Sequence, residues 1–119
     1  MKDLKVFLIA SLLSFSIFSQ TEENYSTALE LIKQGFNDSN ASLIHQKFDS
    51  NLKTEQAEVN FKTMIDSLHR EKGLLQEFEF LMDEDNEKNY LVDFENASMM
   101  IIIRLNEAGE ISTLKIKEY

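Results

Sequence analysis

The chain has 119 residues, no cysteine, proline or tryptophan, and a formal net charge of -9. About a hundred residues beyond a leader segment predict one domain with one modest core. The negative charge argues against a nucleic-acid partner and against docking on an anionic membrane, since both require a basic surface. The lack of cysteine excludes thiol catalysis, cysteine-ligated metals and the acylated cysteine of a lipoprotein.

The first twenty residues have the pattern of a secretory signal peptide. Lys2 and Lys5 flank a charged start, an almost purely apolar run covers residues 6–18, and Ser19 suits the cleavage position. This run is too short to cross a hydrocarbon core of roughly 30 Å as a helix. We expect cleavage of residues 1–19 before Gln20, no membrane span afterwards, and export to the periplasm or beyond. A short uncleaved membrane anchor is the alternative.

Helical spacing dominates the first half of the remaining chain. The first stripe of large apolar side chains consists of Tyr25, Leu29, Ile32 and Phe36. Residues 37–40 form a polar break, and the pattern over residues 43–52 predicts a second, shorter helix. Thr54 suits the N-cap of a third helix, whose apolar face includes Phe61 and which Gly73 is placed to end.

The second half has the alternation of β-strands. The expected strands cover residues 74–82, 90–95, 99–105 and 111–117, with an acidic turn at 83–89 and a glycine hairpin at 106–109. The apolar run at 99–105 predicts a central strand covered on both sides. Strands that follow helices indicate a single α+β domain over residues 20–119, with N-terminal helices packed on one face of a four-stranded antiparallel sheet.

The order of these motifs is similar to that of a known family. The resemblance is carried by the Phe48-Asp49 pair, the Leu52-Lys53 step, the Gly73 cap and the hairpin at residues 106–111. Over residues 22–118 the chain resembles the exported bacterial domain-of-unknown-function 3887 family. That resemblance implies a cystatin-like or nuclear-transport-factor-2-like cone, whose relatives often bind a small molecule between sheet and long helix. It implies no catalytic motif.

Catalytic and metal-binding candidates are few. His45 and His69 are the only histidines. In an enzyme, His45 and Asp49, four residues apart on one helical face, would be the pair for acid–base chemistry. The simpler interpretation is that both histidines are surface or rim residues. No histidine spacing predicts a metal or cofactor, and the acidic run at 83–87 lacks the arrangement of a calcium-binding loop.

Acidic residues also alternate along two expected strands. Glu77 and Glu79 fall on one side of the first strand, opposite Phe78 and Phe80, and a similar alternation follows in the second strand. Paired carboxylates can serve glycoside cleavage, but a polar outer sheet face is the simpler interpretation. Such a face could present a negative surface to a partner.

The absence of a catalytic motif favours an exported, non-enzymatic binding or accessory domain. The candidates for a ligand pocket or an interface are Tyr25, Phe48, Phe61, Met100 and Ile102. If one side of the central strand were open, Met100 and Ile102 would be exposed, and a homodimer formed sheet to sheet would cover them. The expected partner is a small hydrophobic ligand or a protein. The alternatives are a small hydrolase or isomerase using the cone pocket, and a sheet-mediated dimerisation module.

Overall fold

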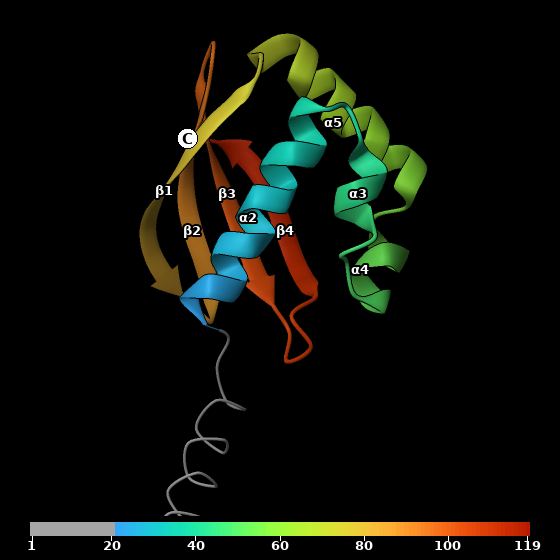
Figure 1. The fold of residues 1–119 in the computed structure, drawn as a ribbon, viewed down its shortest axis with the longest axis vertical. Helices are drawn as coiled ribbons and strands as arrows, with labels where there is room; N and C mark the ends of the chain where they lie inside the picture. Colours follow the sequence, from blue (N-terminus) through green and yellow to red (C-terminus); the bar gives the residue numbers. More distant parts are fainter. Residues whose placement is uncertain (1–20) are drawn as a thin grey trace, which may run out of the picture.

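The computed structural model describes residues 21–119; the expected signal segment and its cleavage site before Gln20 lie outside these residues. Helices come first and strands follow (Figure 1). The elements are α2 (Glu22–Asn37), α3 (Ala41–His45), α4 (Ser50–Glu55), α5 (Glu58–Lys72), β1 (Leu75–Glu84), β2 (Glu87–Phe94), β3 (Ser98–Leu105) and β4 (Ile111–Glu118). The α+β class predicted from the sequence is confirmed.

Helix α2 forms where its apolar stripe predicts. Thr21 is its N-cap, and the Thr21 side chain accepts a hydrogen bond from Asn24 N at 3.1 Å. The buried face of α2 comprises Tyr25, Ala28, Leu29, Ile32, Gly35 and Phe36. The helix ends in the predicted polar break, where Ser39 takes a left-handed conformation with φ 54° and Asn40 N donates to Gly35 O at 2.8 Å.

The next segment departs from the prediction. A single helix over residues 43–52 is wrong, because α3 and α4 are separate helices joined by residues 46–49. In the joining segment, Asp49 N donates to Ile111 O at 2.8 Å, and Ile111 N donates to Lys47 O at 2.8 Å. These bonds to the start of β4 take the chain out of the helical conformation, so tertiary pairing overrides local helix propensity here.

The start of the long helix α5 also differs from the prediction. Thr54 is not its N-cap, because Thr54 lies inside α4 and its Oγ1 donates to Ser50 O at 3.0 Å. Ala57 occupies the N-cap position without a side-chain hydrogen bond. The end of α5 is as predicted: Gly73, with φ 83°, is the C-cap, and its N–H donates to His69 O at 3.0 Å.

The strands form an antiparallel meander in the order β1-β2-β3-β4, and helices α2 to α5 lie on one side of it (Figure 1). The first turn is shorter than the predicted acidic turn at residues 83–89. Asp83 pairs with Lys88 and Glu84 with Glu87, so only two residues connect the strands. Both turn residues have positive φ, which is the conformation of a tight hairpin whose twist matches the strands.

One hydrophobic core lies between the helices and the sheet. The rings of Phe48 and Phe61 are 5.0 Å apart, and those of Phe36 and Phe94 are 5.1 Å apart. Strand β3 contributes alternate residues, namely Met99, Ile101, Ile103 and Leu105. The described helices therefore cover β3 on one side, not on both sides as predicted.

Candidate functional site

Three predicted pocket residues belong to the core. Tyr25 is 6% exposed, and Phe48 and Phe61 are each 1% exposed. The Tyr25 hydroxyl accepts a hydrogen bond from Leu105 N at 3.2 Å, which joins α2 to the end of β3. The space between helices and sheet where a ligand pocket was expected is occupied here by aromatic side chains. These residues hold the two layers together.

His45 and Asp49 each have a different partner. His45 is buried at 8% exposure, so the expected surface or rim position is wrong for this histidine. Its Nε2 lies 2.8 Å from Gln56 O, a carbonyl that accepts the ring proton. The other ring nitrogen lies 3.7 Å from Glu58 Oε1. Asp49 is the N-cap of α4, where its Oδ1 accepts a hydrogen bond from Leu52 N at 2.8 Å. Both side chains therefore fix the path of the chain around α4.

A serine–histidine contact that the sequence did not reveal lies where α2 turns into α3. Ser39 Oγ is 3.1 Å from His69 Nδ1, and both border a hollow of about 400 Å³ with Asp66 and Arg70. A serine nucleophile needs a base that a third group orients. Here the Asp66 carboxylate is engaged by Lys62 Nζ at 2.7 Å. The contact instead ties the helix corner to α5.

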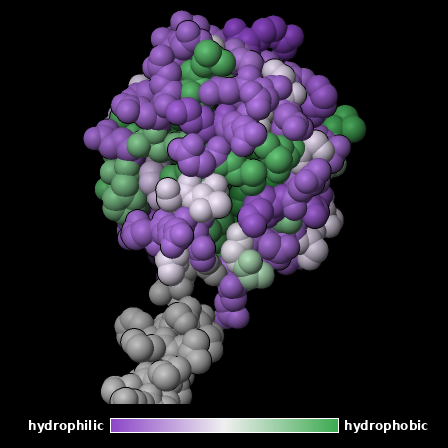
Figure 2. Space-filling view, viewed as in Figure 1, coloured by the Kyte–Doolittle hydropathy of each residue, from purple (hydrophilic) through white to green (hydrophobic). Residues whose placement is uncertain are grey.

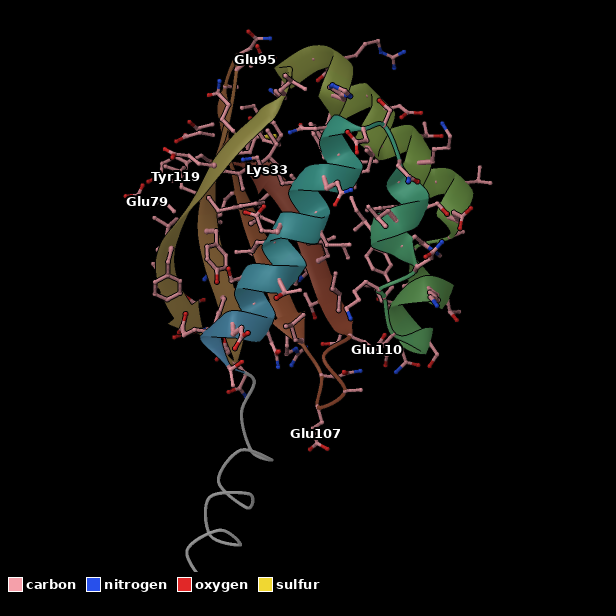
Figure 3. All side chains as sticks on the ribbon, in the orientation of Figure 1. Lys33, Glu79, Glu95, Glu107, Glu110 and Tyr119 are labelled. Atoms are coloured by element: carbon pink, nitrogen blue, oxygen red, sulfur yellow. The ribbon has the colours of Figure 1, made fainter. Side chains whose placement is uncertain are left out.

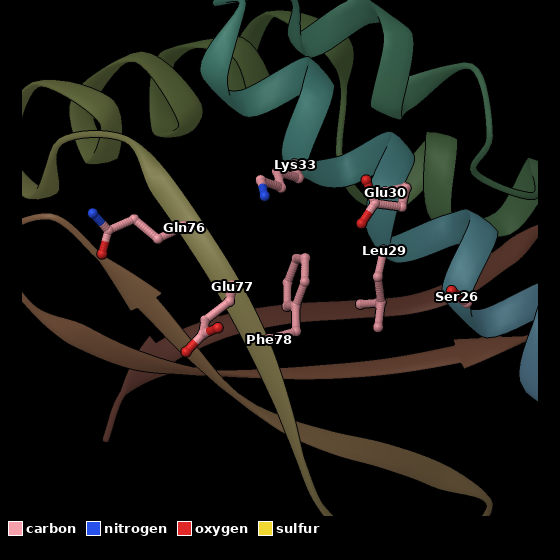
Figure 4. A pocket seen from close by; sticks show the side chains of 7 residues that line it. All are labelled: Ser26, Leu29, Glu30, Lys33, Gln76, Glu77 and Phe78. Atoms are coloured by element: carbon pink, nitrogen blue, oxygen red, sulfur yellow. The ribbon is translucent and has the colours of Figure 1, made fainter.

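A groove runs between α2 and β1, with a volume of about 260 Å³ (Figure 4). Phe78 rises from β1 toward α2 and lies beside Leu29, so the two side chains give the groove an apolar floor. Glu30 and Lys33 on α2 place opposite charges along its rim. Glu77 points from β1 to the other side of the sheet. The groove therefore combines an apolar floor with a polar helix wall.

This groove opens along the free edge of β1. The Asn37 side chain occupies the start of that edge: its Nδ2 donates to Leu75 O at 2.9 Å, and Leu75 N donates to its Oδ1 at 2.8 Å. Beyond Leu75, no backbone segment within residues 21–119 pairs with the outer edge of β1. Apolar surface is visible over β1 at the left of Figure 2, on the strand that carries Phe80 and Met82, each 50% exposed. Unpaired backbone beside exposed apolar side chains makes this edge the candidate binding surface.

Contacts of one lysine, Lys88, join α2 to strands β1 and β2. Lys88 Nζ lies 5.1 Å from the ring centroid of Tyr25, 5.2 Å from that of Phe80, and 3.0 Å from Asp83 Oδ1. Burial alone would lower the pKa of Lys88, but the hydrogen bond and charge of Asp83 hold it above its ordinary value. Burial, helped by nearby negative charge, raises the pKa of Tyr90 to about 12. The ammonium therefore stays charged and the phenol stays neutral at physiological pH.

The opposite face of the sheet has no helix of the described residues over it. Figure 3 shows Glu79 pointing from β1 away from the helices. Met100 and Ile102, the remaining two predicted interface residues, lie on this face. The expected exposure of these two residues on an open face is wrong for Ile102, which is 9% exposed between its cross-strand neighbours Asn89 and Lys115, and Met100 is half-buried. The predicted alternation of β1, with glutamates outward and phenylalanines toward the helices, is confirmed.

Within residues 21–119, no group of three or more acidic or histidine side chains is placed to hold a metal ion. None of the helices described there has both the length and the apolar character that crossing a membrane requires.

No protein-family model matches the chain, and neither a curated protein nor a solved structure gives a significant match. The surface of the domain thus provides the observations that bear on function.

Proposed function

We propose that this protein is an exported, non-enzymatic binding domain that takes up an extended segment of a partner protein along the free edge of β1. The observation that carries the proposal is the unpaired edge beside the α2–β1 groove. An added strand would satisfy the N–H and C=O groups of that edge, as the Asn37 amide does at Leu75. Strand addition of this kind gives affinity through the main chain and specificity through alternate side chains.

The pleat of β1 sets the side-chain pattern of the segment that fits. Every second residue of an added strand would face the groove floor of Leu29 and Phe78, where an apolar side chain fits. The residues between would lie beside Glu77 and Glu79 on the outer face, where lysine or arginine forms opposite-charge cross-strand pairs. An extended segment that alternates apolar and basic residues is therefore the preferred occupant.

The export component of the proposal rests on the signal-peptide pattern of residues 1–19. The resemblance to the domain-of-unknown-function 3887 family supports the same location and a non-enzymatic role. Mass spectrometry of the protein isolated from its native cells tests the location. We expect a mature chain that begins at Gln20 in the exported fraction. An intact N-terminus in the cytoplasmic fraction would contradict it.

A synthetic peptide tests the binding mode. The probe has about eight residues of alternating lysine and valine, the length of a typical strand. The control peptide has the same composition, with its lysines and valines in separate blocks. We expect the alternating peptide to shift the NMR amide signals of β1 and α2 and to bind about tenfold or more tightly than the control. Equal binding of both peptides would show that charge alone attracts them.

Two variants of α2 locate the binding site. Ser26 lines the groove, whereas its neighbour Thr27 lines a different part of the helix surface, and both are exposed. Ser26→Trp fills the groove and is expected to weaken peptide binding about tenfold or more, because the apolar side chains of the peptide lose their floor. Thr27→Trp adds the same bulk elsewhere and should leave binding unchanged. Wild-type affinity in Ser26→Trp would rule out the groove as the site.

A further inference from the structure

The sheet face turned away from the helices is divided by charge. Its carboxylates are Glu77, Glu79 and Glu84 on β1, and Glu87 and Asp93 on β2. Its cations are Arg104 on β3, and Lys115 and Lys117 on β4. An acidic half therefore adjoins a basic half on one surface, with half-buried apolar side chains such as Leu91 and Met100 between them.

The strand register arranges this face in rows. Across the middle of the sheet, Glu79 is the partner of Leu91, Leu91 of Met100, and Met100 of Lys117. The row thus reads acid, apolar, apolar, base. A copy of the same row turned end for end is complementary to it, because each charged end meets its opposite and the apolar centres coincide. A surface of this kind is self-complementary under a two-fold rotation.

We propose that this face forms a homodimer whose two-fold axis lies between the two sheets, runs parallel to the strands and passes between β2 and β3. The rotation places β1 of one protomer over β4 of its partner. Each Glu79 then meets the partner's Lys117, and each Leu91 meets the partner's Met100. The dimer uses the sheet face opposite the α2–β1 groove and goes beyond the proposed binding function, although Glu79 also borders the outer side of the proposed peptide site.

Charge selects this axis over the other two-fold that could stack the sheets. An axis running across the strands would place β1 over β1 of the partner. Glu77 and Glu79 would then face glutamates of the partner's β1, and Lys115 and Lys117 would face lysines of the partner's β4. Like charges brought together at an interface repel each other and weaken the complex. The charge division therefore fixes the orientation of the partner as well as its identity.

The available area suits a weak dimer. Four strands about 4.8 Å apart, with about eight residues rising roughly 3.3 Å each, make a face of roughly 500 Å². Two such faces bury about 1,000 Å² in total, which is the low end of specific interfaces. We therefore expect a dissociation constant on the order of micromolar or weaker at physiological ionic strength.

Charge reversal at two positions tests the pairing. Glu79→Lys and Lys117→Glu each place like charges together twice in the dimer, and each is expected to weaken it about tenfold or more in sedimentation equilibrium. The matched controls are Glu23→Lys on α2 and Lys53→Glu on α4, which change the net charge equally at exposed helix positions. The controls should dimerise like the wild type.

Mixing the two variants gives the decisive result. In a heterodimer of Glu79→Lys with Lys117→Glu, both cross-interface contacts again join opposite charges, so near wild-type affinity should return. A mixture that stays monomeric, or a wild-type protein that is monomeric at about millimolar concentration, would overturn the proposal. Lys117→Glu should still bind the alternating peptide and Ser26→Trp should still dimerise, so the dimer and the groove can fail separately.

Discussion

Gly73 and Gly109 share a positive φ, at 83° and 81°, but have different surroundings. A Cβ on Gly73 would lie 2.9 Å from both Cβ and Oε1 of Glu95, whereas a Cβ on Gly109 would meet nothing within 4 Å. Glu95 Oε1 also accepts a hydrogen bond from Leu74 N at 2.7 Å, at the start of the sheet. The sequence predicts a glycine cap at Gly73, but the contact that crowds it comes from Glu95, which directly follows β2.

Alanine at these two glycines compares a crowded site of positive φ with an open one. We expect Gly73→Ala to lower the free energy of unfolding by about 2–4 kcal/mol, and Gly109→Ala by about 1 kcal/mol. Both variants give a residue with a Cβ a positive φ. Gly73 also has ψ -159°, a backbone region that is essentially restricted to glycine, and only Gly73→Ala displaces Glu95. Urea denaturation of the two variants measures the difference. Equal losses would show that neither the backbone conformation of Gly73 nor its contact with Glu95 adds a cost.

The sequence predicts which side chains lie on an apolar face of an element, but not which other residues those side chains contact. Tyr25, Phe48 and Phe61 fall on apolar stripes, and a stripe looks the same whether it lines a pocket or packs in a core. The structure gives these rings close neighbours and thus a packing role. The Ser39–His69 contact had no sequence signal at all, because thirty residues of chain separate two ordinary polar side chains.

At the scale of elements, the sequence predicts the apolar helix stripes and the strands. It does not predict features that depend on contacts between residues far apart in the chain. Helix α2, the end of α5 and all four strands follow from periodicity and glycine signals. The split into α3 and α4 depends on Ile111, which lies far along the chain and contributes nothing to a local pattern. The groove depends on how α2 lies beside the edge strand β1, which the alternation within β1 does not encode.

The start of α4 depends on the Asp49 cap. Asp49→Ala removes the acceptor for Leu52 N and is expected to lower the free energy of unfolding by about 1 kcal/mol. Asp49→Asn keeps an acceptor oxygen and should stay within a few tenths of the wild type. Asp38→Ala, at the C-cap of α2, removes a carboxylate from the negative end of a helix and should cost nothing. Urea midpoints compare the three, and an unchanged Asp49→Ala would show that the bonds to Ile111 suffice.

At the scale of the whole molecule, a net charge of -9 conceals an internal order. Lys115 and Lys117 share one edge of the sheet face, and Glu77 and Glu79 share the other. The sequence predicts that such residues are exposed but not that four strands sort them by sign. The register does so, because each strand adds one residue to each row. The domain is acidic as a whole, but its sheet face has a basic edge at β4 and an acidic edge at β1. The basic edge of one copy is therefore complementary to the acidic edge of a second copy.

The stability of the whole domain should fall in alkaline solution, and Tyr90 is one cause. Its pKa is about 12 in the folded protein because of burial, against an ordinary value of 10. Above about pH 10 the unfolded chain loses this proton first, so the free energy of unfolding falls as pH rises toward about 12. The raised pKa of Lys88 acts in the same direction, since the folded state also keeps that proton longer.

Tyr90→Phe removes the phenol and should flatten this decline. Urea unfolding at several pH values between about 9 and 11.5 should show a loss smaller by on the order of 1–2 kcal/mol than in the wild type. Tyr119→Phe is the control, because Tyr119 is 76% exposed at the end of the chain and should keep the wild-type slope. If Tyr90→Phe declined as steeply as the wild type, the phenol would be as free to ionise in the folded protein as in the unfolded chain. The Tyr90 and Phe80 rings, whose centroids are 5.6 Å apart, would then separate in solution and expose the C-terminal half of β1.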